Sequence, residues 1–137
     1  MEYLYFTLQI LLAIVLGGVL GWQREKIGKP AGPRTYALVA AGSALFTLLS
    51  LSAFGTVNTV QVAAQIVTGV GFLGAGIIIH RDGGIVEGLT TAAGFWAAAA
   101  IGMAVGAGWL IQAGIATLLL LIILSIDDHK FLRKKKR

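Results

Sequence analysis

The sequence contains no cysteine, and only 12% of its 137 residues are charged. Without cysteine the chain has no disulfide, no thiolate metal site and no cysteine nucleophile. A typical soluble domain carries about 25% charged residues, and a soluble fold of this length could not bury an apolar share of 57%. The composition therefore predicts a single-domain membrane protein and excludes a disordered chain, which would be polar and charged.

Charged side chains are absent from three long stretches of the sequence, residues 3–23, 35–80 and 88–126. A membrane-spanning helix needs about 20 apolar residues, so the first stretch accommodates one span and each of the others two. Turn-like residues at 55–59 and 106–108 divide the two longer stretches. We therefore expect an all-α integral membrane protein, a compact bundle of five transmembrane helices within residues 1–128, with spans at about residues 4–22, 35–54, 60–79, 89–105 and 109–126.

The basic residues predict the orientation of this bundle. All eleven Lys and Arg residues fall in the first loop, the third loop or the tail, which five spans place on one side of the membrane. Cytoplasmic loops carry the excess of Lys and Arg, so we expect the N-terminus outside and the C-terminus in the cytoplasm. Residues 129–137 then form a basic cytoplasmic tail, which could hold anionic lipid or serve only to fix the topology. No soluble fold accompanies this tail, so no nucleic-acid partner is expected.

Small residues are abundant, with 19 glycines in the chain. Small side chains let helix backbones approach closely in a bilayer, and Gly17 and Gly21, like Gly102 and Gly106, are spaced four residues apart. We expect tightly packed helices with little room for a wide pore. Five short helices also leave much lipid-facing surface, so a homo-oligomer, with a dimer as the favoured form, is a second expectation.

The predicted spans hold no ionisable residue near their centres. Ion pumps and proton relays usually place such groups there, and their absence counts against simple proton-coupled transport. Gln65 and Thr68 lie three residues apart and share a helix face, so they could line a polar path. The alternative is that these side chains bond to nearby carbonyls or to neighbouring helices.

Ionisable and hydroxyl groups gather instead at the cytoplasmic ends of the predicted helices. Arg34 follows Pro33 at a helix start, where free N–H groups and the positive end of the dipole attract anions. Its planar guanidinium suits carboxylate or phosphate. The alternative interpretations are structural: arginines that set topology, a brace from Arg34 to Asp82 or Glu25, or threonine caps. The candidate ligand or partner contacts are Arg24, Glu25, Arg34, Thr35, Asp82, Thr90 and Thr91.

Metal binding and catalysis have weaker support in the sequence. Magnesium prefers oxygen ligands and keeps much of its water, which makes Asp82 and Glu87 weak candidates, and the run Asp127-Asp128-His129 has no diagnostic spacing. Magnesium is considered as a ligand or substrate, and no cofactor is expected. Both histidines flank spans without a serine-based partner, so we expect no enzyme activity.

Several motifs occur together in a fixed order. They are Gly21-Trp22-Gln23-Arg24-Glu25, Lys29-Pro30-Ala31-Gly32-Pro33-Arg34-Thr35, Ala64-Gln65-Ile66-Val67-Thr68-Gly69 and Gly88-Leu89-Thr90-Thr91-Ala92-Ala93. In this set the sequence resembles the MgtC/SapB family, over roughly residues 11–124. The resemblance marks as functional candidates Arg24, Glu25, Arg34, Thr35, Gln65, Asp82, Thr90 and Thr91.

The resemblance implies a multi-pass protein of the bacterial inner membrane with five helices. It also implies a role in growth at low magnesium, in survival inside host cells and in membrane energetics, exercised as a regulator through contact with other membrane proteins such as ATP synthase. The alternative is a transporter of magnesium or another ion that acts as an oligomer. Two departures matter: many relatives carry a C-terminal soluble domain, whereas this chain stops after Arg137, and some have Asn where Thr90 stands.

Overall fold

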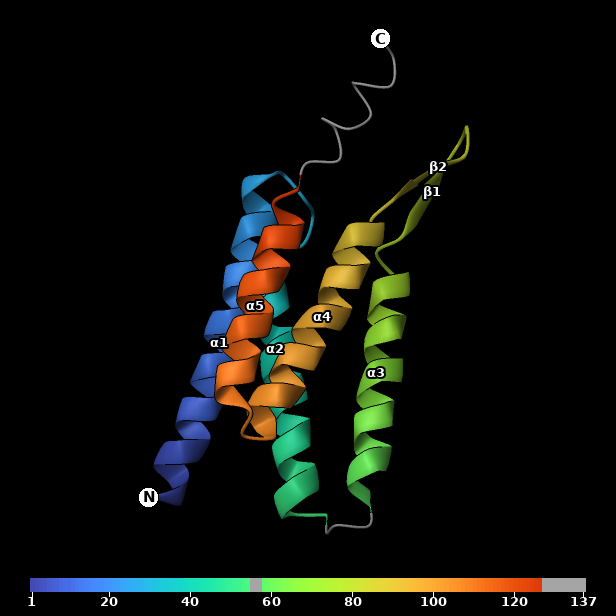
Figure 1. The fold of residues 1–137 in the computed structure, drawn as a ribbon. Helices are drawn as coiled ribbons and strands as arrows, with labels where there is room; N and C mark the ends of the chain where they lie inside the picture. The colour runs from blue at the N-terminus through green and yellow to red at the C-terminus, as the bar shows by residue number, and fades with distance from the viewer. Residues whose placement is uncertain (55–57, 127–137) are drawn as a thin grey trace.

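Five helices form the body of the protein in the computed structural model, which describes residues 1–54 and 58–126. The helices are α1 (Glu2–Lys26), α2 (Pro33–Ser52), α3 (Thr59–Ala75), α4 (Leu89–Gly106) and α5 (Leu110–Leu124). They run side by side along one direction, and a small hairpin of β1 (Ile79–Arg81) and β2 (Ile85–Glu87) projects beyond them at one end (Figure 1). The predicted helical architecture is confirmed, and the hairpin is an addition to it.

Among the described helices, three are long and apolar enough to cross a membrane: α1 with 25 residues, α2 with 20 and α4 with 18. The other two, α3 and α5, are also apolar but have only 17 and 15 residues. At a rise of about 1.5 Å per residue they measure about 25 and 22 Å, against a hydrocarbon core of about 30 Å. The described helices therefore define a helical membrane protein.

The third predicted span is longer than the helix found there. The sequence predicts a helix over residues 60–79, but α3 ends four residues earlier and strand β1 follows. The two strands pair antiparallel around Gly83 and Gly84, whose φ angles of 90° and 78° favour glycine. The apolar residues 77–79 therefore lead into a hairpin rather than completing a membrane helix, which corrects the purely helical fold.

Helices α1, α2 and α4 form the centre of the bundle, where glycine lets their backbones touch. Gly17 on α1 faces the Tyr36 carbonyl and the Ala40 methyl group of α2. Gly102 on α4 faces the Ala40 carbonyl. A side chain at either glycine would collide with backbone atoms, so the prediction of close small-residue packing is confirmed for these three helices.

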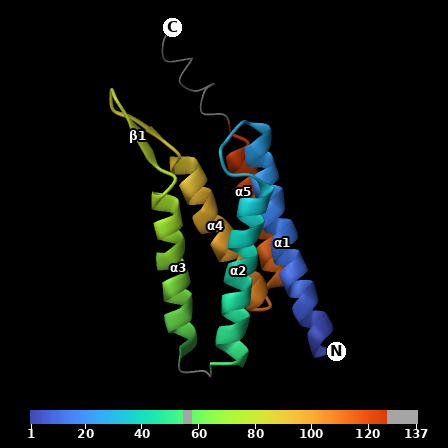
Figure 2. The same cartoon turned by 180° about the vertical axis from the view of Figure 1, so that it is seen from behind.

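Helix α3 is set apart from this centre. It contacts α4 and, less extensively, α2, and it stands at the edge of the bundle in views from opposite sides (Figures 1 and 2). A side chain added at Gly69 or Gly71 would meet no atom within 4 Å. These small residues of α3 therefore do not serve helix packing within one copy of the chain.

Candidate functional site

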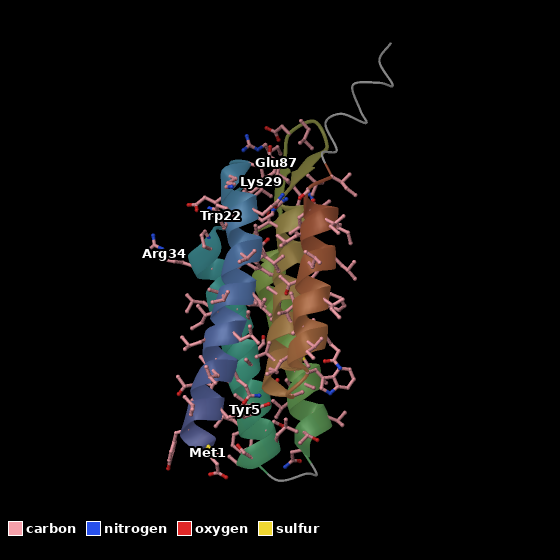
Figure 3. The ribbon with its side chains drawn as sticks, turned by 60° about the vertical axis from the view of Figure 1, so that its left-hand side comes forward. Met1, Tyr5, Trp22, Lys29, Arg34 and Glu87 are labelled. Atoms are coloured by element: carbon pink, nitrogen blue, oxygen red, sulfur yellow. The ribbon has the colours of Figure 1, made fainter. Side chains whose placement is uncertain are left out.

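The charged residues gather at one end of the bundle, which we name the charged end. It is formed by the end of α1, the start of α2, the hairpin and the start of α4 (Figure 1). Lys29 and Glu87 mark it in Figure 3, with Met1 and Tyr5 at the opposite end. Within residues 1–54 and 58–126, its members are Arg24, Glu25, Lys26, Lys29, Arg34, Arg81, Asp82 and Glu87, and Glu2 alone of the charged side chains lies elsewhere.

Arg24 is the buried member of the charged end, with only 3% of its surface exposed. It lies near the end of α1, where Gly21 packs against the backbone of Gly32 and Pro33 and brings α1 against the start of α2. The Arg24 guanidinium donates a hydrogen bond of 3.3 Å from Nη2 to the Thr91 hydroxyl. Because Thr91 lies in the first turn of α4, this contact connects the end of α1 to the start of α4.

Tyr36 joins this contact from α2 and is fully buried. Its hydroxyl donates to the Thr91 carbonyl oxygen at 3.4 Å and also interacts with the Arg24 side chain. Its ring meets Phe95 edge-on with the centroids 5.0 Å apart, and Gly94 leaves the space that the hydroxyl occupies. We call Arg24, Tyr36 and Thr91 the arginine cluster.

The arginine cluster carries a positive charge that no described residue neutralises. In residues 1–54 and 58–126, no carboxylate oxygen lies within 4.0 Å of the Arg24 guanidinium, the distance that defines an ion pair. The buried Nε atom also has no hydrogen-bond partner in that part of the chain. A buried charge without a partner costs several kcal/mol. The cluster is therefore chemically suited to receive a negatively charged group.

Glu25, the neighbour of Arg24 in the sequence, serves a different helix. Its side chain is exposed, and its Oε1 atom would lie 3.6 Å from a Cβ atom at Gly32, the residue before α2. No side chain caps α2 with a hydrogen bond, so a carboxylate beside its positive end stabilises the helix. Glu25 is thus a dipole partner of α2 rather than a counterion of Arg24.

Three other predicted site residues, Arg34, Thr35 and Thr90, lie away from the arginine cluster. The Arg34 side chain is exposed and points away from the bundle (Figure 3). Among the described residues it forms no ion pair with Asp82 or Glu25. Thr35 and Thr90 are exposed as well. The structure therefore brings together Arg24 and Thr91 of the predicted set, and the predicted Arg34 brace is not formed.

The hairpin carries an ion pair of its own. Arg81 Nη2 lies 3.1 Å from Glu87 Oε2, with the two side chains 61% and 50% exposed, and such exposed pairs contribute about 0–1 kcal/mol. Asp82 is exposed in the turn. The described residues bring no three His, Asp or Glu side chains together as a metal site, and the run 127–129 lies outside them. The weak metal candidates Asp82 and Glu87 thus gain no support.

The predicted polar path at Gln65 and Thr68 is not formed inside the bundle, because both side chains are exposed on α3. The Thr68 hydroxyl donates to the Ala64 carbonyl of its own helix at 3.1 Å, as the alternative interpretation predicts. Gln65 lines a groove of about 580 Å³ between α2 and α3, together with the polar side chains of Gln61 and Ser43.

Sequence reasoning misses Tyr36 and two glutamines of α1. The Gln9 amide donates from Nε2 to the Val105 carbonyl at 2.8 Å, near the end of α4. The Gln23 amide donates to the Leu124 carbonyl at 2.8 Å, at the end of α5. The Gln23 amide satisfies a last-turn carbonyl that has no donor within its own helix. The Gln9 amide adds a second donor to the Val105 carbonyl, which also accepts from the Gly108 N–H at 3.0 Å. The available signal is the amide itself, since a glutamine in an apolar helix needs a partner.

These features define a helical membrane protein with a buried arginine cluster at one charged end. The model of the MgtC family matches residues 10–130, so the chain belongs to the MgtC family. The family resemblance predicted from the motifs is thereby confirmed. No solved structure matches the chain.

Three relatives show the range of similarity. The "Putative magnesium transporter YhiD" of Escherichia coli K12 is 44% identical over 127 residues, which cover 85% of this chain and 59% of the relative. "Protein MgtC" of Brucella abortus is 45% identical over 111 residues, with coverages of 81% and 46%. "Protein SrpB" of Synechococcus elongatus is 41% identical over 138 residues, with coverages of 90% and 75%. The chain thus spans about half the length of several curated relatives it matches.

Proposed function

We propose that this protein is a magnesium-related protein of the bacterial inner membrane that regulates other membrane proteins through its charged end. The name of the Escherichia coli relative supports the link to magnesium, and the family supports the membrane setting. The arginine cluster carries the regulatory role, because it holds a buried charge at one end of a tightly packed bundle. The apolar stretches 35–80 and 88–126 contain no Asp, Glu, Lys or Arg, and His80 lies at the boundary of the first stretch. This favours a protein that presents a site at its surface over one that conducts ions.

In this proposal all five helices cross the membrane, with the N-terminus outside and the charged end in the cytoplasm. The position of the basic side chains supports that orientation, and small thinning of the bilayer accommodates the two shorter helices. The chain has no cysteine, so single cysteines report the topology directly. Asn58→Cys should react with an impermeant reagent from outside, and Asp82→Cys only after the membrane is opened. The reverse pattern of labelling would refute this orientation.

The second candidate function is transport of magnesium as a substrate by an oligomer. The name of the Escherichia coli relative favours it. The sequence weighs against it, because magnesium prefers carboxylate oxygens among protein ligands and the three apolar stretches contain no Asp or Glu. The groove at Gln65 offers only amides and a hydroxyl.

Growth and flux together separate these two functions. A strain lacking its own family member is grown at low magnesium with the wild type, with Arg24→Gln, and with Arg34→Gln as a control that removes the same charge from an exposed site. We expect Arg24→Gln alone to lose growth support at equal protein level, and purified wild type to carry no magnesium into proteoliposomes. Flux through the wild type that Arg24→Gln abolishes would establish the transporter instead.

The regulatory role also requires a partner in the membrane, and ATP synthase is one candidate. Cross-linking from Asp82→Cys in native membranes should capture the same membrane protein from independent preparations. Cross-linking from Asn58→Cys, which lies at the other end, serves as the matched control. If the partner is cross-linked only from Asn58→Cys, it binds at the end opposite the charged end, and the proposed regulatory surface is refuted.

We also propose that two copies pair through the groove between α2 and α3. Gln65 is exposed there in an apolar stretch, without a hydrogen-bond partner among the described residues. A lipid chain would leave this amide unsatisfied, whereas a second Gln65 amide both donates and accepts, as a two-fold interface requires. Gln65→Leu should shift cross-linked dimer to monomer, whereas Thr68→Val should not. If Gln65→Leu leaves the amount of cross-linked dimer unchanged, the proposed interface is refuted.

A further inference from the structure

Two features that favour negative charge meet at the arginine cluster. The first is the side chain of Arg24, a residue with only 3% of its surface exposed. The second is the start of α4, where no side chain caps the helix. The first hydrogen bond of α4 runs from the Ala92 N–H to the Gly88 carbonyl, so the N–H groups of the three residues between them have no acceptor within the helix. A helix start of this kind attracts anions.

The acidic side chains of the charged end are engaged elsewhere or exposed. Glu25 lies beside the start of α2, Glu87 pairs with Arg81, and Asp82 is exposed in the hairpin turn. The Arg24 Nε atom is left buried and without a hydrogen-bond partner in the described part of the chain. Buried polar groups are otherwise almost always satisfied, so this unsatisfied donor itself indicates that a ligand completes the site.

We propose that the arginine cluster binds the oxygen atoms of a phosphate group. The guanidinium, the Thr91 hydroxyl and the first-turn N–H groups of α4 together supply more donors than the two oxygens of a carboxylate can accept. A phosphate presents three or four oxygens, and an arginine fork matches its geometry. Leu89 and Thr90 are exposed, so the start of α4 is reachable from the surface.

Two sources of this phosphate share the same chemistry. One is inorganic phosphate from the cytoplasm, and the other is the phosphate of an anionic lipid headgroup, which lies at the depth of the charged end. The second source rests on the proposed function for the orientation of that end. Either source neutralises the buried guanidinium that the described carboxylates leave unpaired.

Binding to the purified full chain tests the proposal. Inorganic phosphate is titrated calorimetrically in a zwitterionic detergent, and the melting temperature is compared between nanodiscs of phosphatidylglycerol and of phosphatidylcholine. The variants are Arg24→Gln, Thr91→Val, which keeps shape and charge, and Arg34→Gln as the matched control. We expect Arg24→Gln to weaken binding at least about tenfold, as for loss of a charge-assisted donor, and Arg34→Gln to leave it unchanged.

The two ligands identify the source of the phosphate. If inorganic phosphate binds the wild type and Arg24→Gln abolishes this binding, the ligand is a soluble anion. If only phosphatidylglycerol stabilises the wild type, and Arg24→Gln abolishes this stabilisation, the ligand is a lipid headgroup. No effect of either ligand on the wild type, or an equal loss with Arg34→Gln, overturns the proposal. If Arg24→Gln does not fold, Thr91→Val decides: weaker binding supports the site, and unchanged binding overturns it.

Failure of this inference is distinguishable from failure of the proposed function. If the wild type binds no phosphate but Arg24→Gln folds and fails to support growth at low magnesium, the phosphate proposal is refuted and the regulatory role still stands. If phosphate binding depends on Arg24 but the Arg24→Gln strain grows normally, the phosphate proposal stands and the regulatory role of the arginine cluster is refuted.

Discussion

Replacing Gly102 by Ala tests the close packing of α2 and α4. A Cβ atom at this position would overlap the Ala40 carbonyl oxygen and stand 3.0 Å from the Ala40 Cα atom. Gly→Ala in a helix gains about 1 kcal/mol of intrinsic propensity, and overpacking costs about 1–3 kcal/mol. Since the obstructing atoms are backbone and cannot rotate away, the clash prevails. We expect Gly102→Ala to lower the free energy of unfolding by about 1–2 kcal/mol, toward the upper end of the difference between these two effects.

Gly71→Ala on α3 is the matched control for this substitution. A Cβ atom there would meet no atom within 4 Å, so only the propensity gain of up to about 1 kcal/mol remains. Both variants are unfolded reversibly in mixed micelles with a denaturing detergent and followed by the fluorescence of the three tryptophans. If Gly102→Ala proves as stable as Gly71→Ala, the contact between the backbones of α2 and α4 is refuted.

Three further predictions concern single polar contacts, measured in the same assay. Gln9→Leu removes the side-chain donor to the Val105 carbonyl, which keeps its bond from the Gly108 N–H, and should cost about 1 kcal/mol; an unchanged stability would show that the backbone bond alone satisfies that carbonyl. Tyr36→Phe keeps the buried ring and loses one hydroxyl bond, for a cost of about 1 kcal/mol; a loss above about 3 kcal/mol would mean that the hydroxyl holds more than the contact described. A double-mutant cycle of Arg81→Ala and Glu87→Ala should give a coupling below about 1 kcal/mol that falls with salt, and a salt-independent coupling would contradict an exposed pair.

The positions of the helices could be predicted because a hydrocarbon layer excludes charge, and because turn-like residues at 55–59 and 106–108 divide the two longer uncharged stretches. The hairpin could not be predicted in the same way. Its residues 77–79 are apolar and follow α3 without interruption, so they extend an apolar run. The available signal was Gly83-Gly84 between two short β-branched runs, which is typical of a hairpin turn. The distribution of apolar residues predicts where a membrane segment lies, whereas the turn-forming residues predict where its helix ends.

The candidate site could be predicted only in part. Arg24 and Thr91 stand out in the sequence as polar groups at helix ends, whereas Tyr36 does not. In a soluble protein the buried face of a helix is marked by apolar spacing, but a membrane helix is apolar on the lipid side as well. Leu38 on α2 is 73% exposed and Tyr36 is fully buried, although they lie only two positions apart in the sequence. Which face of α2 meets α1 and α4 is therefore decided by tertiary packing and not by composition.

Hydrogen bonds at both ends of α1 fix its register against α4. Gln9 and Arg24 lie fifteen residues apart on α1, and their partners Val105 and Thr91 lie fourteen apart on α4. At about 1.5 Å per residue these spacings are about 22 and 21 Å, so the two antiparallel helices are held at matching heights. Lipid and helix surfaces are equally apolar, so apolar contact alone favours no one register. An anion that draws the guanidinium away from the Thr91 hydroxyl would release one of these two contacts, which connects the phosphate proposed for Arg24 to the geometry that the charged end presents to a partner.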